Sequence, residues 1–122
     1  MTLAEARQRA EAWVAAWNAR DLDAVLEHYA DDVVVCSPLV AKRLGRANGT
    51  LRGKAELRAY FATGMGNPAL QFTLDDVRLG VHVMTVLYTR ENGIRVADTI
   101  ELDAEGRATR MTACYAGGET DV

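Results

Sequence analysis

Asp98 is the residue whose surroundings in the sequence most favour acid–base chemistry. It lies in the middle of the strand-like segment IRVADTIEL, two residues from Val96 and two from Ile100. Side chains alternate between the two faces of a strand, so these three share one face. A carboxyl group on a core-facing side is desolvated, which raises its pKa and marks it as a functional candidate. The structural alternative is an ion pair with Arg90 or Arg110 that holds the sheet together.

His82 is the candidate base. It alternates with Met84, Val86 and Tyr88 along a long strand-like run. If that face lines an interior cavity, the imidazole can accept a proton there, because its ordinary pKa is near neutral. The alternative is an exposed histidine at a strand end, next to Gly80.

Ser37 follows a buried strand and precedes Pro38. A serine hydroxyl is neither a base nor a nucleophile without a partner base. A triad of Ser37, His82 and Asp98 would supply one. The sequence contains no G-x-S-x-G nucleophile elbow, which disfavours that arrangement.

Metal and disulfide chemistry have little support. Cys36 and Cys114 show no C-x-x-C spacing and have no histidine nearby, so we expect two buried free thiols. The acidic pairs Asp31-Asp32 and Asp75-Asp76 are adjacent residues, which point to opposite sides of a strand and cannot chelate together. We expect no metal and no cofactor.

Two kinds of periodicity define the elements that carry these residues. Helical spacing predicts helices over residues 3–17, 22–29 and 53–64, the first of them capped by Thr2 and Glu5. The β-branched run at 33–35 predicts a buried strand, and residues 41–52 read as an exposed loop with a short strand at its end. From residue 70 the pattern is that of strands, with Asn92-Gly93 marking a hairpin.

The order α-α-β-α-β-β-β-β predicts an α+β fold in which a mostly antiparallel sheet buries one face under the first helix. A length of 122 residues suits a single domain, with a flexible tail over 116–122. The net charge of −3 disfavours nucleic-acid and anionic-membrane partners. No membrane-spanning run or targeting segment is evident, so we expect a cytoplasmic protein.

Three segments carry a resemblance to known proteins: AWVAAWNARDLDAVLEHYADDVVV, LRGKAELRAYF and DTIELDAEGRATRM. They resemble the nuclear-transport-factor-2-like superfamily, and most closely its polyketide-cyclase-like (SnoaL-like) and ketosteroid-isomerase-like branch. The resemblance spans roughly residues 3–115. It implies a cystatin-like cone, in which a curved sheet wraps round N-terminal helices and encloses a ligand pocket, and it implies frequent homodimers. The superfamily contains isomerases, cyclases, dehydratases, hydrolases and non-catalytic carriers, so the fold does not fix the function.

The ketosteroid isomerase pattern matches this sequence in one of its three parts. Asp98 matches the late-strand acid that donates a hydrogen bond to an oxyanion. Trp13 stands where the pattern has a helix tyrosine, and it offers only an indole N–H. Ser37 stands where the pattern has the aspartate base. Isomerase chemistry by that route is therefore disfavoured.

We expect a mostly apolar pocket that binds a small hydrophobic molecule. It would act on a carbonyl or cyclic compound as an isomerase, cyclase or dehydratase, with Asp98 as acid or oxyanion donor. The alternative is a non-catalytic ligand-binding or dimer-scaffold domain. Arg43, in the loop at the pocket mouth, would meet an anionic or carbonyl ligand unless it is simply solvated. The expected lining is Trp13, Trp17, Ser37, Phe61, Tyr88, Arg90 and Tyr115.

Overall fold

The computed structural model describes residues 1–116 and contains helices and strands in the order αα-β-α-β-α-ββββ. The predicted tail lies, apart from Ala116, outside the described residues. The elements are α1 (Leu3–Asn18), α2 (Leu22–Leu26), β1 (Tyr29–Cys36), α3 (Pro38–Leu44), β2 (Thr50–Arg52), α4 (Gly53–Met65), β3 (Thr73–Leu79), β4 (Val83–Thr89), β5 (Arg95–Leu102) and β6 (Ala108–Tyr115).

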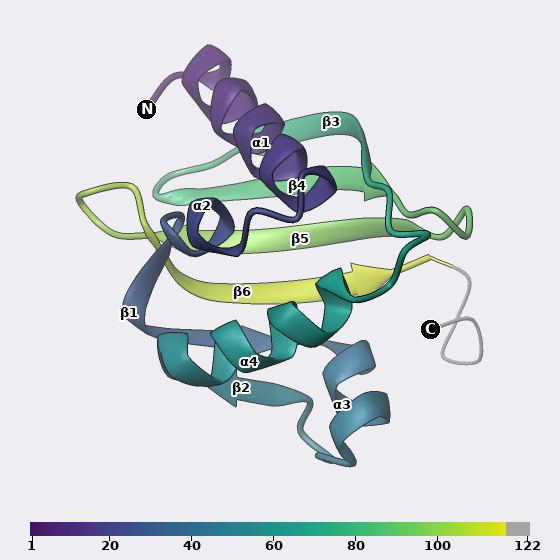
Figure 1. Cartoon of the computed structure of the whole chain (residues 1–122). Coiled ribbons are helices and arrows are strands. Elements are labelled where there is room, and N and C mark those ends of the chain that lie inside the picture. The colour runs from purple at the N-terminus through teal and green to yellow at the C-terminus, as the bar shows by residue number, and fades with distance from the viewer. Residues whose placement is uncertain (117–122) are drawn as a thin grey trace.

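The strands form one curved six-stranded sheet in the order β2-β1-β6-β5-β4-β3. Every neighbouring pair is antiparallel except β1 and β6, which run parallel. Figure 1 shows α1 and α4 on the same face of this sheet, α1 near β3 and α4 near β1. The expected α+β cone is confirmed, and its enclosed face is the one that the helices cover.

Short polar side chains begin the first helices. Thr2 Oγ1 accepts a hydrogen bond from the N–H of Glu5 at 3.1 Å, and Asp21 caps α2 in the same way. Helix α1 then buries Ala6, Ala10 and Trp13 against the sheet, together with further residues of the same stripe. The predicted covering role of this helix is confirmed.

Helix α3 was not expected, because residues 41–52 were predicted to form an exposed loop with a short strand at its end. Ser37 Oγ accepts from the N–H of Leu39 at 3.2 Å, and Pro38 occupies the first helical turn, where its missing N–H is harmless. The helix ends at Gly45, whose φ of +66° is left-handed. The same Ser-Pro that ends β1 therefore starts a helix, and the predicted short strand appears as β2.

The alternation along the late strands fixes which side chains face inward. Val96 and Asp98 are buried on β5, whereas Arg95, Thr99 and Glu101 on the opposite face are exposed. The same parity on β6 turns Cys114 outward. The expectation of buried thiols is therefore wrong for Cys114, which is exposed, and Cys36 is partly exposed as well; both are free. Among residues 1–116, no helix is long and apolar enough to cross a membrane.

Candidate functional site

A cavity of about 70 Å³ lies between the helices and the inner face of the sheet. Helices α1, α3 and α4 contribute one wall, and strands β1, β4, β5 and β6 contribute the other. Its lining consists of Trp13, Trp17, Val35, Ser37, Leu39, Val40, Arg43, Tyr60, Phe61, Gly64, Leu70, Phe72, Tyr88, Arg90, Asp98, Met111, Ala113 and Tyr115.

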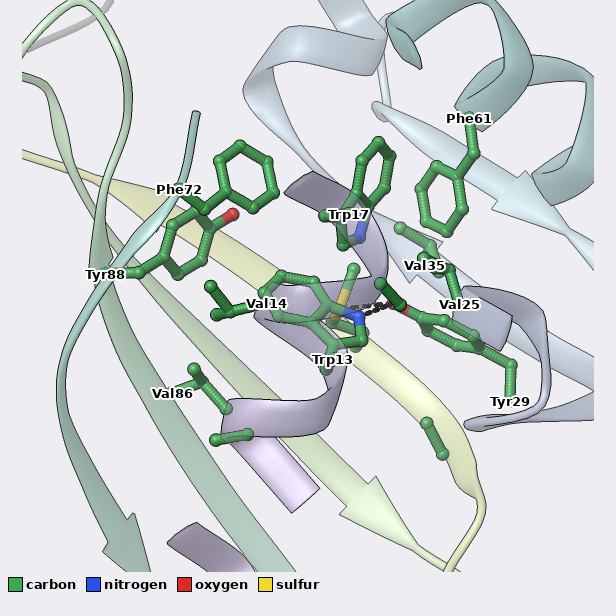
Figure 2. Close-up of a cluster of buried hydrophobic side chains, with 14 of the residues drawn as sticks. Trp13, Val14, Trp17, Val25, Tyr29, Val35, Phe61, Phe72, Val86 and Tyr88 are labelled. Atoms are coloured by element: carbon green, nitrogen blue, oxygen red, sulfur yellow. Dashed lines mark hydrogen bonds between the residues drawn. The ribbon is translucent and has the colours of Figure 1, made fainter. Parts of the chain in front are cut away.

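Aromatic rings form a continuous wall of this cavity (Figure 2). The ring centroids of Trp17 and Phe61 lie 4.8 Å apart in an edge-on arrangement, and those of Phe72 and Tyr88 also lie 4.8 Å apart. Trp13 joins the two pairs through Tyr88, at 5.3 Å. Edge-on and tilted contacts of this kind are favourable beyond the area they bury, so they stabilise this arrangement of rings.

Asp98 is the acidic residue of the cavity, and its side chain is only 2% exposed. It lies in the middle of the sheet, opposite Val86 on β4 and Ala113 on β6. Burial raises the pKa of Asp98 to about 7, although a hydrogen bond from Tyr88 and the charge of Arg90 act in the opposite direction. Near neutral pH the carboxyl group is therefore present in both protonation states.

Arg90 lines the cavity beside Asp98, but its ion pair is with Glu91, at 3.5 Å. Its guanidinium also lies over the ring of Phe72, 5.5 Å from the centroid. Arg110 pairs with Glu101 at 3.9 Å on the outer face of the sheet. The structural alternative for Asp98, an ion pair with either arginine, is therefore wrong.

Buried polar atoms without a hydrogen-bond partner gather at this cavity. Within residues 1–116 there are four such side-chain atoms: Trp17 Nε1, Tyr60 Oη, Arg90 Nε and Asp98 Oδ1. All four residues line the cavity. A buried polar group without a partner costs free energy unless water or a ligand satisfies it. The concentration of these atoms in one place makes this cavity the candidate site.

The two residues that stand in place of the ketosteroid isomerase groups have structural partners. The indole N–H of Trp13 donates to the hydroxyl of Tyr29 at 3.0 Å. The hydroxyl of Ser37 caps α3 and lies 3.5 Å from the hydroxyl of Tyr115. Neither arrangement supplies a base, in agreement with the reading of the sequence.

His82 lies away from this cavity, in the turn between β3 and β4, where it lines a separate surface hollow. Its φ of +56° is left-handed, and strand β4 begins only at Val83, so the alternation that buries Met84 and Val86 does not extend back to it. The structure does not bring His82 to Asp98, and a triad with Ser37 is not formed.

The other predicted pocket residues meet at the cavity, Arg43 among them. Sequence reasoning did not place Tyr60 and Phe72 in the lining, and it missed Leu39 and Val40 because α3 was unforeseen. The adjacent Tyr60-Phe61 pair was an available signal, since neighbouring residues on a helix can both border a wide pocket. Within the described part of the chain, no group of three or more His, Cys, Asp or Glu side chains could hold a metal ion.

Comparison with known proteins identifies the family. The family model described as a SnoaL-like domain matches residues 10–116. A SnoaL-like protein of unknown function from Burkholderia thailandensis has a similar structure, with a TM-score of 0.91 and 34% sequence identity over 95% of this chain and 98% of that chain. A search of curated proteins found no match.

Two more distant structures share the fold alone. A protein with a cystatin-like fold from Methylobium petroleophilum gives a TM-score of 0.78 at 19% identity, covering 97% of this chain and 80% of that chain. A SnoaL-like family member from Agrobacterium tumefaciens, for which an isomerase activity has been suggested, gives 0.72 at 18% identity, covering 93% and 99%. The match of the family model and the similarity to the Burkholderia protein show that the chain belongs to the SnoaL-like family.

Proposed function

We propose that the protein binds a small hydrophobic carbonyl compound in this cavity and acts on it by proton transfer through Asp98, as an isomerase, cyclase or dehydratase. The observation that carries the proposal is the unpartnered Oδ1 of Asp98 in a largely apolar cavity. A carboxyl group in that position lacks the solvent or ion-pair partner that a structural acid has. The isomerase suggested for the Agrobacterium protein belongs to the same broad class of reaction.

The carbonyl oxygen of the ligand would accept a hydrogen bond from an unpartnered donor of the cavity, the N–H of Trp17 or the hydroxyl of Tyr60. That bond strengthens as negative charge develops on the oxygen during enolisation, which is the requirement for catalysis. The ionised form of Asp98 would remove a proton from the carbon next to the carbonyl group, and the protonated acid that results would return this proton to a carbon of the enolate. A pKa near the working pH makes both forms available, which favours a single residue as proton shuttle.

The rest of the cavity would orient the ligand. Its flat apolar part would lie against the rings of Trp17, Phe61 and Phe72, which exclude water from the reacting atoms. The N–H of Trp17 and the hydroxyl of Tyr60 would each gain the partner that they lack.

The test is exchange of the hydrogens next to the carbonyl group in a panel of small cyclic ketones, followed by NMR in deuterated water. We expect Asp98→Asn to slow enzyme-dependent exchange by about 10²-fold or more. Glu101→Gln, which removes an exposed acid from the outer face of the same strand, is the control and should keep the wild-type rate. Exchange at the wild-type rate in Asp98→Asn would show that Asp98 is not the acting acid.

A non-catalytic carrier is the second candidate. It is favoured by one observation: neither Ser37 nor His82 supplies a second base at the cavity. A carrier would be stabilised against heat by its ligand through mass action and would release that ligand unchanged. Recovery of a chemically altered ligand would exclude this candidate.

We also propose that the protein is a homodimer that pairs through the outer face of the sheet. This face carries Thr85, Thr99 and Cys114, and the hydroxyls of Thr85 and Thr99 are 3.2 Å apart. Light scattering at micromolar concentration should give twice the mass of the chain. A monomer mass, or a dimer mass that Thr99→Arg leaves unchanged, would contradict pairing through this face.

A further inference from the structure

We propose that the ligand of this cavity is an aromatic carboxylate, whose carboxylate group is bound by Arg90 and Arg43 while its ring lies against Trp17, Phe61 and Phe72. The inference rests on the proposed binding function of the cavity and names the chemical class that the cavity selects.

Arg90 is fixed by several contacts, but the Nε of its guanidinium has no hydrogen-bond partner. Its backbone N–H donates to the carbonyl oxygen of Ile94 at 2.8 Å, which fixes the residue in the hairpin between β4 and β5. Its Nη2 lies 3.5 Å from Glu91, and its guanidinium stacks on Phe72. Its Nε is buried and has no partner. Arginine recognises carboxylates through two parallel N–H donors, so a fixed arginine with a free Nε is suited to that group.

The charges at the cavity favour an anion. The charged residues among its lining are Arg43, Arg90 and Asp98. Burial raises the pKa of Asp98 to about 7, so this acid is partly neutral at that pH, and the two arginines then leave an excess of positive charge. Glu91 offsets part of the charge of Arg90 from outside the lining. Arg43 is exposed and lies beside Tyr60, at the solvent side of the cavity.

The balance of hydrogen-bonding groups points in the same direction. Trp17 Nε1 and Arg90 Nε can only donate, and both lack an acceptor. The hydroxyl of Tyr60 can donate as well. A ligand that satisfies these groups must therefore carry several acceptor atoms, as a carboxylate does. A neutral hydrocarbon or simple ketone would leave at least one buried donor unsatisfied.

An anionic ligand also makes binding depend on pH. The groups that act on Asp98 are Tyr88 from β4, Arg90 from the turn after β4, Tyr29 from β1 and Tyr115 from β6. Burial raises the pKa of all three tyrosines, so they stay neutral while Asp98 titrates. Ionised Asp98 would repel a carboxylate. Affinity should therefore fall as the pH rises past the pKa of this acid.

The experiment compares phenylacetate with phenylacetamide, which has nearly the same shape and no charge, by isothermal titration calorimetry on the full chain. We expect phenylacetate to bind at least about tenfold more tightly. Arg90→Gln and Arg43→Gln should each remove most of that preference. Arg110→Gln is the matched control, because it removes an ion-paired strand arginine from the outer face, and it should keep the preference.

The pH dependence gives an independent readout. Between about pH 6 and pH 8.5 we expect the affinity for phenylacetate to fall by about tenfold or more in the wild type, and to stay nearly constant in Asp98→Asn. Equal or tighter binding of phenylacetamide, or no binding of either compound at millimolar concentration, would overturn the inference. Displacement of phenylacetate by inorganic phosphate at a similar concentration would show that the site binds anions in general. That result would also overturn the inference.

These outcomes separate the inference from the proposed function. If neutral ketones bind and exchange hydrogens in an Asp98-dependent way while phenylacetate does not bind, the proposed function stands and the carboxylate class is wrong. If phenylacetate binds with the expected preference but no ketone is altered, the carboxylate class stands and the proposed catalytic function is wrong.

Discussion

The indole N–H of Trp13 lies 3.0 Å from the hydroxyl of Tyr29, and this hydrogen bond joins the middle of α1 to the start of β1. Both residues are buried, and the Tyr29 hydroxyl lies 3.7 Å from the sulfur of Met111 on β6. Three elements that are distant in sequence therefore meet at one polar contact inside an apolar core (Figure 2).

Tyr29→Phe should destabilise the protein because it leaves the Trp13 N–H buried without an acceptor. We expect the free energy of unfolding to fall by about 1 to 3 kcal/mol, measured by urea denaturation with tryptophan fluorescence. Tyr60→Phe is the matched control. The Tyr60 hydroxyl has no partner, so its removal should change stability by less than about 0.5 kcal/mol. Equal losses in the two variants would contradict this role of the Tyr29 hydroxyl.

Asp98 should make the folded state less stable as the pH rises from about 4 to about 8. Its pKa is raised from 3.8 to about 7 on folding, so across this range the folded state binds more protons than the unfolded state. Stability therefore decreases with pH, by an upper limit of about 4 kcal/mol for this group. The measurement is the free energy of unfolding across the range.

Asp98→Asn isolates this effect, since every other titrating group is common to the two proteins. The difference in stability between the variant and the wild type should grow in favour of the variant as the pH rises. A difference that is constant between about pH 4 and pH 8 would mean that Asp98 is not desolvated.

Gly49→Ala should be much more damaging than Gly45→Ala, although both glycines have left-handed φ values, of +60° and +66°. A Cβ at Gly49 would lie 2.6 Å from the carbonyl oxygen of Ser37, whereas a Cβ at Gly45 meets nothing within 4 Å. Gly45→Ala should therefore cost about 1 kcal/mol from backbone conformation alone. Gly49→Ala should cost about 1 to 3 kcal/mol more. Thermal denaturation of both variants checks this, and similar midpoints would contradict it.

Ala113→Leu should block the cavity without unfolding the protein. Ala113 lines the cavity opposite Asp98 in the sheet, so a larger side chain would occupy the space that a ligand needs. We expect ligand affinity to fall by about tenfold or more, as measured by calorimetry. Ala97→Leu, on the outer face of β5, is the control and should bind normally. Unchanged affinity in Ala113→Leu would place the ligand elsewhere.

Much of the fold could be predicted because its periodic signals are strong. The apolar stripe of α1 and the alternation around Asp98 each have one side facing the core, and burial of that side enforces the pattern. Helix α3 could not be predicted from the reading that Pro38 ends a strand. Proline is also favoured in the first turn of a helix. The capping contact of Ser37 with Leu39 shows that Pro38 begins a helix here.

The candidate site was predictable where it lies on regular strands and not where the backbone departs from them. Asp98 was placed there by its alternation with Val96 and Ile100, Tyr88 was expected there as an aromatic lining residue, and both line the cavity. His82 was given the parity of β4, but its left-handed backbone breaks the alternation one residue before the strand begins. The lack of a partner for Arg90 Nε could not be predicted, because it follows from the position of the side chain against Glu91 and Phe72, which the sequence does not reveal.

The place of β6 in the sheet has a consequence for how the chain acquires its shape during synthesis. This strand is made after all the other described elements, yet it lies between β1 and β5 and is parallel to the former. Until it emerges, the ribosome-bound chain can pair β3, β4 and β5 in one part of the sheet and β1 with β2 in another, and only the helices connect the two parts. Strand β5 would then be an edge strand, and Asp98 would lack its neighbour Ala113 until the final strand docks. The surroundings of Asp98, the acid that is proposed to act on ligands, would therefore be completed only in the last step of folding.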